Sequence, residues 1–255
     1  MNSIIGIASR HNTVPDLLRC LRQMDHADHN NCGLVVYGRQ GPTASPPRLH
    51  RHRRAQPISV WMDPLKIPHP QTQHELNPLD KLQGEVGMGH TGLADTQGPN
   101  GLQSVLPQIS HGPEEHLNSP AKVAVVAHGQ LQVTDGLREA LSDRGYRFKS
   151  NSDSELLAHL IDATHQGNAV QALQRTLGLL KGPVAMGVMF HDQPGHLFAV
   201  QRGVSLYWRS DRESTAWATD SKALPCDAGE LKLLSDGLVL EFHPSGEHIA
   251  HRLHG

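Results

Sequence analysis

Near the start of the chain, the spacing of apolar residues is first typical of a strand, then of a helix, and then of a strand again. Residues 3–8 form a short apolar run, which predicts a buried strand. In residues 14–25, apolar side chains recur at helical spacing, so we predict an amphipathic helix that begins near Pro15. Residues 32–38, CGLVVYG, predict a second strand that ends at a glycine.

The middle of the chain carries two strand patterns followed by three helix patterns. Residues 84–95 and 122–131 alternate or cluster apolar residues as strands do. Residues 133–148 predict a helix that ends at Gly145, and residues 169–182 predict another. Between them, residues 150–167 carry a cap signature, in which Ser152 and Asp153 precede Glu155 and an apolar stripe follows.

The last third of the chain reads as short strands separated by turn residues: VAMGVMF, HLFAVQR, TAWATD and GLVLEF. Strands, then a run of helices, then more strands predict a layered α/β sandwich with mainly antiparallel sheets. No linker interrupts the pattern, so we expect a single domain over residues 1–255. Residues 39–83 are rich in Pro, Gln, His and Arg and predict a divergent, loop-rich insert with one strand, PISVWM, at residues 57–62.

Composition narrows the class of protein further. Hydrophobic residues make up 37% and charged residues 19% of the 255 residues, as in a globular domain. The net charge of −2 gives no overall field that favours nucleic acid or an anionic membrane. No stretch approaches the roughly 18 apolar residues of a membrane span, and no signal peptide is visible, so we expect a cytoplasmic protein. Three widely spaced cysteines do not form a disulfide framework.

The order of these elements, and several local motifs, resemble one known family. The chain opens MNSIIG, and the segments GHTGLADT, GLREALSDRGYRFKSNSDSELLAHL, LKGPVAMGVMF and AWATDSKAL follow in order. Together they resemble the class II glutamine amidotransferase domain of the N-terminal-nucleophile (Ntn) hydrolases, most of all the glutaminase half of glucosamine-6-phosphate synthase. The likeness covers nearly the whole chain and is weakest over residues 39–83. It implies a four-layer α/β/β/α sandwich (α+β) with two antiparallel sheets.

The resemblance also implies a catalyst that this sequence lacks. The family uses an N-terminal cysteine in the second coded position, whose thiolate attacks the glutamine amide while its own amino group acts as the base. Here that position is Asn2, and a carboxamide is not a nucleophile. Because Asn2 is bulky, we also expect Met1 to be retained. Ser3 carries a hydroxyl, but it stands where the family has glycine and would need cleavage after Asn2 to act.

Two further family sites are degenerate. The arginine that holds the substrate carboxylate is replaced in the matching segment His90-Thr91-Gly92, so a bidentate charged contact is lost. The Asn-Gly oxyanion element aligns with His128-Gly129. Unless Met1 and Asn2 fill the space, this relic substrate cleft should be wider and less electropositive. His90 and His128 would restore positive charge only below their ordinary pKa of about 6.5.

One family element is present. Asp153 matches the aspartate that, by the resemblance, holds the substrate amino group. An equally good interpretation is that Asp153 is only a helix N-cap.

Two signals outside the family motifs suggest other chemistry. His26, His29 and Cys32 have a spacing that could ligate zinc, although a solvated loop explains them as well. Residues 48–56, RLHRHRRAQ, form a basic run that could bind a polyanion. No aromatic residues interleave with it to stack on bases, so we do not expect nucleic acid as the partner.

These observations favour a catalytically inactive glutamine-amidotransferase-like protein that acts as a scaffold, regulatory or partner-binding subunit. Its partner would be another protein, such as a separately encoded amination enzyme or ligase, and no cofactor or membrane is expected. Two alternatives stay open. One is a working amidotransferase or amide hydrolase with a displaced nucleophile, and the other is a polyanion binder that uses residues 48–56.

Overall fold

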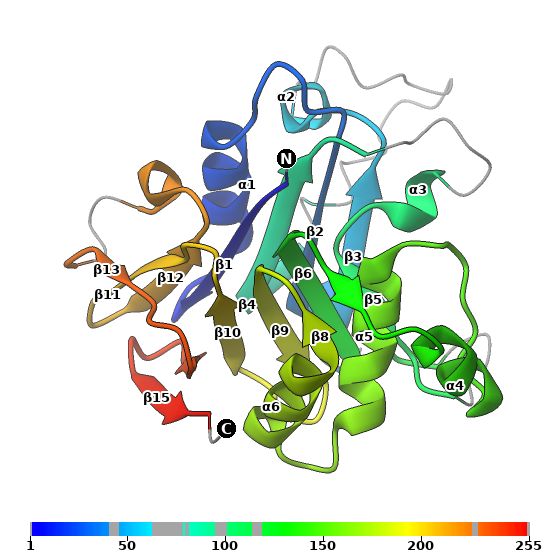
Figure 1. The fold of residues 1–255 in the computed structure, drawn as a ribbon. Coiled ribbons are helices and arrows are strands. Elements are labelled where there is room, and N and C mark those ends of the chain that lie inside the picture. Colours follow the sequence, from blue (N-terminus) through cyan, green and yellow to red (C-terminus); the bar gives the residue numbers. More distant parts are fainter. Residues whose placement is uncertain are drawn as a thin grey trace.

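Two antiparallel sheets lie face to face between layers of helices in the computed structural model (Figure 1). The structure describes residues 2–40, 46–62, 79, 82–94, 101–113, 119–225 and 229–253. Helix α1 covers one outer face, and α5 and α6 cover the opposite one. The four-layer α/β/β/α sandwich expected from the sequence is therefore confirmed.

The first sheet has seven strands among the described residues, and the N-terminal strand lies in its centre. In spatial order they are β13 (Lys232–Leu233), β11 (Tyr207–Ser210), β12 (Ser214–Ala218), β1 (Ser3–Ser9), β4 (Leu82–Gly92), β2 (Asn31–Gln40) and β3 (Arg48–Arg54). Helices α1 (Val14–Gln23) and α2 (Ile58–Trp61) and the short 3-10 turn η2 (Ser221–Ala223) share an apolar cluster with its outer face.

The second sheet has six described strands: β15 (His248–Arg252), β14 (Leu238–Phe242), β10 (Leu197–Arg202), β9 (Val184–Phe190), β6 (Val123–Gly129) and β5 (Gln108–Ser110). Its outer face is covered by helices α4 (Leu137–Asp143), α5 (Asp153–Thr164) and α6 (Ala169–Leu179). A two-stranded ribbon, β7 (Gln132–Val133) and β8 (Leu180–Lys181), and the short helix α3 (Gly101–Ser104) complete the described elements.

The layers follow from the alternation of side chains along each strand. In β1, Ile4 points between the two sheets, whereas Ile5 packs under α1. In β6, Val125 packs against the helices of the second sheet, and Val126 points between the sheets. Because both faces of these strands are buried, the strands read as continuous apolar runs in the sequence.

Trp217 of β12 lies between the two sheets and is fully buried. Its strand neighbour in β1 is Gly6, and the facing strand β9 presents Gly187. A Cβ atom at either glycine would overlap with the indole ring. The two glycines therefore make the space in which the largest side chain of the core sits.

The N-terminal cap predicted for the central helix, α5, is present, and Ser152 alone forms it. Ser152 is the N-cap of α5, and its hydroxyl accepts the backbone N–H of Glu155 at 3.2 Å. The Glu155 carboxylate accepts the backbone N–H groups of Lys149 at 2.8 Å and Ser150 at 2.7 Å. Asp153 is the first residue of the helix, so its interpretation as the N-cap was wrong.

Two predictions in the insert were also wrong. Residues 57–62 form the short helix α2 instead of a strand, because Pro57 starts a turn that buries Ile58 and Trp61 on the same side. Residues 48–54 form the edge strand β3, which pairs along β2, where a loop was expected. Charged residues are common on edge strands because they prevent further pairing, and that composition hid the strand. Residues 41–45, 63–78 and 80–81 lie outside the described part.

Within the described part of the chain, no helix has both the length and the apolar character needed to cross a membrane.

We predict that Gly187→Ala lowers the free energy of unfolding by about 1–3 kcal/mol, because the added methyl group overlaps with the buried indole of Trp217. Chemical denaturation monitored by tryptophan fluorescence measures the change. Gly178→Ala is the matched control: Gly178 lies in α6, and an added Cβ would meet nothing within 4 Å. It should be neutral or stabilising by up to about 1 kcal/mol. Equal effects of the two substitutions would contradict the packing role of Gly187.

Candidate functional site

Strand pairing brings several of the predicted site residues to one end of the first sheet. The end of β4 lies between the beginnings of β1 and β2, with Ser3 opposite Thr91 and Asn31 opposite Gly92. In Figure 1 the N-terminus is accordingly seen beside the tip of β4. The residue that precedes Ser3, Asn2, therefore lies against Gly92.

The side chain of Asn2 occupies the space next to Gly92. A Cβ atom built on Gly92 would overlap with Asn2 Oδ1 and lie 2.8 Å from His90 Cε1. The backbone carbonyl of Asn2 accepts a hydrogen bond from His128 Nδ1, across from the second sheet. The asparagine is therefore held from both sides, and the space that an arginine side chain at position 92 would need is filled.

A pair of asparagines at the start of β2 fixes the other side of this site. Asn31 Nδ2 donates to the carbonyl of Gly92 at 2.9 Å, and its Oδ1 accepts from His90 Nε2 at 2.6 Å. Asn30 exchanges two hydrogen bonds with Ala94, one to the carbonyl at 2.8 Å and one from the N–H at 3.0 Å. Sequence reasoning missed both residues, and the repeated Asn before a strand was the only local signal for them.

Thr91 is fully buried and lies in a second polar group. Its hydroxyl is 3.1 Å from both Asp25 Oδ1 and His29 Nδ1. His29 Nδ1 also accepts the backbone N–H of His26, which leaves the Thr91 hydroxyl free to donate to Asp25. These contacts hold the loop before β2 against the end of β4.

The histidines of the site are not a source of positive charge. His90 is fully buried, and burial lowers its pKa to about 3, with a further contribution from His29. Burial also lowers the pKa of His128, an effect partly opposed by its hydrogen bond to Asn2. The expectation that both titrate near their ordinary pKa of about 6.5 was therefore wrong. At neutral pH, two neutral rings flank Asn2.

Two other predicted residues stand apart from this network. Gly129 is exposed at the end of β6, and its φ of 123° favours glycine. In addition, a Cβ atom there would overlap with the carbonyl of Pro183. Asp153 is exposed at the first turn of α5, and no described hydrogen bond or ion pair joins it to Asn2, His90 or His128. Its role in holding a substrate amino group stays a prediction.

The predicted zinc ligands do not form a site. His29 Nδ1 accepts the backbone N–H of His26, and Cys32 lies fully buried within β2, where burial raises the pKa of its thiol to about 12. Among the described residues, the ligand atoms of His26, His29 and Cys32 do not form a group close enough together to hold a metal ion. The sequence spacing misled because Cys32 belongs to a strand and not to the loop.

The basic run is already engaged with the protein. Arg53 donates to the carbonyls of Val105 at 2.8 Å and Gln103 at 3.1 Å, and Arg54 stacks over the ring of Trp61. Burial lowers the pKa of His52 to about 4, so this histidine is neutral at physiological pH. These contacts speak against the polyanion alternative.

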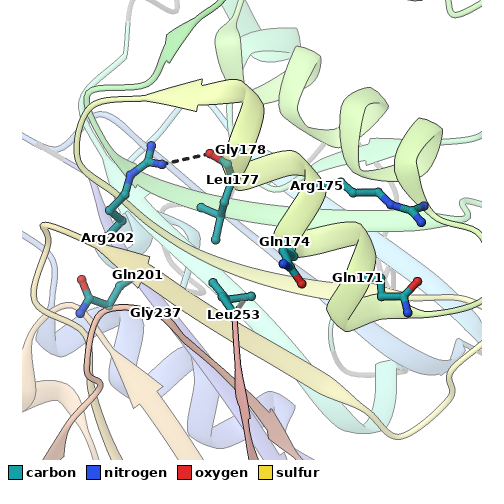
Figure 2. Close-up of a pocket in the computed structure, with 9 residues that line it drawn as sticks. All are labelled: Gln171, Gln174, Arg175, Leu177, Gly178, Gln201, Arg202, Gly237 and Leu253. Carbon is teal, nitrogen blue, oxygen red and sulfur yellow. Dashed lines mark hydrogen bonds between the residues drawn. The ribbon is translucent and has the colours of Figure 1, made fainter. Parts of the chain in front are cut away.

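A cavity of about 820 Å³ lies elsewhere, between α6, β10 and the segment after β15 (Figure 2). Arg202 lines it but donates to the carbonyls of Leu177 at 3.0 Å and Leu180 at 2.9 Å, and Figure 2 shows the first of these bonds. Arg175 is similarly bound to the side chain of Gln166 at 2.9 Å. Because both guanidinium groups hold the fold together, we assign no reaction to this cavity.

Comparison with known proteins agrees with the geometry. A family model described as "Glutamine amidotransferase domain" matches residues 102–226. The glutamine–fructose-6-phosphate aminotransferase (isomerizing) of Bordetella pertussis is 25% identical over 242 residues, which cover 94% of this chain and 36% of that protein. The chain thus spans about a third of the length of the curated relatives it matches.

Two solved structures have the same fold. The glutamine phosphoribosylpyrophosphate amidotransferase of B. subtilis superposes with a TM-score of 0.72 at 20% identity, over 99% of this chain and 49% of that one. A glutamine aminotransferase class-II domain protein from Silicibacter pomeroyi superposes with a TM-score of 0.59 at 14% identity, over 98% and 99% of the two chains. The chain carries a class II glutamine amidotransferase domain. Asn2 therefore stands at the start of the first strand of an amidotransferase domain.

We predict that this end of the amidotransferase domain makes the protein acid-sensitive. His90 has a folded-state pKa of about 3, below its ordinary value of about 6.5, so the unfolded chain binds the extra proton between these values. The stabilisation is complete above about pH 6.5 and is lost as the pH falls towards 3, at about 1.4 kcal/mol per pH unit. Denaturation between pH 7 and 4 should give a shallower loss for His90→Gln than for the wild type.

His11→Gln is the matched control, because it removes the same ring from an exposed position away from the buried site of His90. The half-buried His52, whose pKa is also lowered, contributes to the same slope, so His90→Gln reduces it without abolishing it. Identical slopes for His90→Gln and the wild type would contradict the assignment.

Proposed function

We propose that this domain does not hydrolyse glutamine and acts as a non-catalytic scaffold or regulatory subunit, a pseudoenzyme. One observation carries the proposal: a carboxamide, that of Asn2, is packed against Gly92 in the place of the nucleophile, and His128 holds its carbonyl. A carboxamide provides no electron pair comparable to a thiolate.

The surrounding groups support this proposal. Gly92 offers no guanidinium for a substrate carboxylate, and the neutral His90 beside it offers no replacement charge. Ser3 is the first residue of β1 and pairs with Thr91 inside the sheet, so the displaced-nucleophile alternative would need this end of the strand to be cut and rearranged.

The partner in this proposal is another protein that makes or transfers an amino group. The relatives named aminotransferases carry the matching segment as about a third of their length, so in them the domain works beside further protein. For this chain, a separately encoded amination enzyme or ligase would take that place. Light scattering on a mixture of the two purified proteins, read as the mass of the complex, tests the partner role.

We predict that the purified protein releases no glutamate from glutamine above a buffer blank. Asn2→Cys alone should also be inactive, since the variant gains a thiol but still lacks the carboxylate clamp at Gly92. Only the double variant Asn2→Cys/Gly92→Arg contains both a thiol at position 2 and a guanidinium at position 92. Replacing Asn2 in it also removes the side chain that occupies the space beside residue 92. A coupled glutamate assay measures all three.

Glutamate release by the wild type, abolished by Ser3→Ala, would overturn the proposal and establish a displaced nucleophile. Strong activity of Asn2→Cys alone would instead show that the substrate clamp lies elsewhere than at position 92.

A further inference from the structure

Three histidines and one glutamate gather on one face of the second sheet, at its C-terminal edge and away from Asn2. Glu241 lies on β14, and its neighbours Leu240 and Phe242 point between the sheets, so Glu241 points to the other face. His251 of β15 pairs with Val239, two residues before Glu241, and so lies on the same face diagonally from it. His196 immediately precedes Leu197 and His243 immediately follows Phe242. Because Leu197 pairs with Phe242, the two histidines lie side by side at this end of the strands.

The ligand-type atoms of this cluster converge on the Glu241 carboxylate. His196 Nδ1 is 2.6 Å and His243 Nε2 is 3.3 Å from Glu241 Oε1. His251 Nε2 is 2.7 Å from the other oxygen, Oε2. One possible metal-ligand atom from each of His196, Glu241 and His243 lies within 4.8 Å of the other two. Among the described residues, this is the group of three or more His, Cys, Asp or Glu side chains whose ligand atoms come this close together.

The protein leaves part of this cluster unsatisfied. The His243 Nε2 atom is buried and makes no hydrogen bond, although it lies beside Oε1. The Glu241 side chain is 12% exposed, so its carboxylate is largely removed from water, and three imidazole rings surround it. A half-buried carboxylate with an unpartnered imidazole nitrogen next to it is stabilised by a cation placed between them.

We propose that His196 Nδ1, Glu241 Oε1 and His243 Nε2 bind a divalent transition metal of the zinc class, with His251 orienting the carboxylate through Oε2. Imidazole nitrogen and carboxylate oxygen are common zinc ligands, with bonds of about 2.0–2.2 Å. Tetrahedral bonds of that length place ligand atoms about 3.3 Å apart. His243 Nε2 already lies 3.3 Å from Glu241 Oε1, and His196 Nδ1, now at 2.6 Å, needs to move away from it by about 0.7 Å.

Binding has a defined proton balance. In the metal-free protein, His196 Nδ1 donates its hydrogen to Glu241. To bind the metal through Nδ1, the His196 ring loses the Nδ1 proton. If Nε2 carries no proton, it takes one up and no proton is released overall; if Nε2 already carries one, the Nδ1 proton is released to solvent. His251 keeps its hydrogen bond to Oε2, which is the usual way in which a ligating carboxylate is held by a second group.

The metal would join three neighbouring strands at the end of the sheet. His196 precedes β10, Glu241 and His243 belong to or follow β14, and His251 anchors the edge strand β15, whose other residues are mostly exposed. With three protein ligands, the fourth position is left to water. The site is independent of Asn2 and would operate whether or not the domain hydrolyses glutamine.

The experiment is a zinc titration of the full chain after treatment with a chelator and dialysis, followed by calorimetry. We expect one saturable equivalent and a higher unfolding temperature with zinc. Glu241→Gln and His243→Ala should each weaken binding by about 100-fold or more, and His251→Ala by about 10–100-fold. His248→Ala is the matched control, since His248 lies on β15 like His251 but packs against the ring of Trp208. This variant should bind zinc as the wild type does.

Circular dichroism checks that each variant is folded, and His243→Asn takes the place of any ligand variant that is not. Cobalt gives a second readout, because a His-carboxylate site changes its visible absorption and the signal should disappear in the same variants. The absence of zinc binding would overturn the proposal. Zinc binding that is unchanged in both Glu241→Gln and His243→Ala would also overturn it, because other histidines would then bind the metal. So would an unfolding temperature that depends on pH but not on zinc, since the cluster would then be an ion-pair group only.

Discussion

The insertion of Trp217 between the two sheets is the contact on which the rest of the structure depends. The indole needs glycine on both sides, Gly6 in its own sheet and Gly187 in the facing one. Because Gly6 pairs directly with Trp217, the contact sets the register of β1 at the centre of the first sheet. The residues of β1 from Ser3 to Ala8 then each have a fixed partner on β4, with Ser3 beside Thr91.

That register decides what the end of the sheet can do. It places Asn2 beside Gly92 and under His128, where a nucleophile would have to stand to act on a bound amide. The groups around it are suited to holding a chain end in place: Asn31 binds the carbonyl of Gly92, and burial keeps His90 neutral. The same fold thus supports an amidotransferase architecture while the local chemistry favours a fixed, uncharged contact. The cluster of histidines around Glu241 lies on the outer face of the second sheet and does not depend on this site.

Much of the fold could be read from the sequence, because strands buried on both faces and helices with an apolar stripe have strong local patterns. The patterns failed where composition and structure disagree: β3 is an Arg- and His-rich edge strand, and Pro57 turns an apolar run into a helix. The site was only partly predictable. Asn2 and Gly92 could be named from the resemblance, but nothing local shows that they touch. Asn31 with His90, and His196 with Glu241, are far apart in the chain and meet only through strand pairing.

We propose that this end of the sheet has exchanged substrate binding for a filled, neutral contact. Calorimetric titration with glutamine near neutral pH tests it most directly, since it asks about binding without requiring turnover. The account predicts no saturable heat at millimolar glutamine, because no guanidinium meets the carboxylate and Asn2 occupies the space beside Gly92. A sub-millimolar dissociation constant that is lost in Asp153→Ala would contradict it and show a working glutamine site.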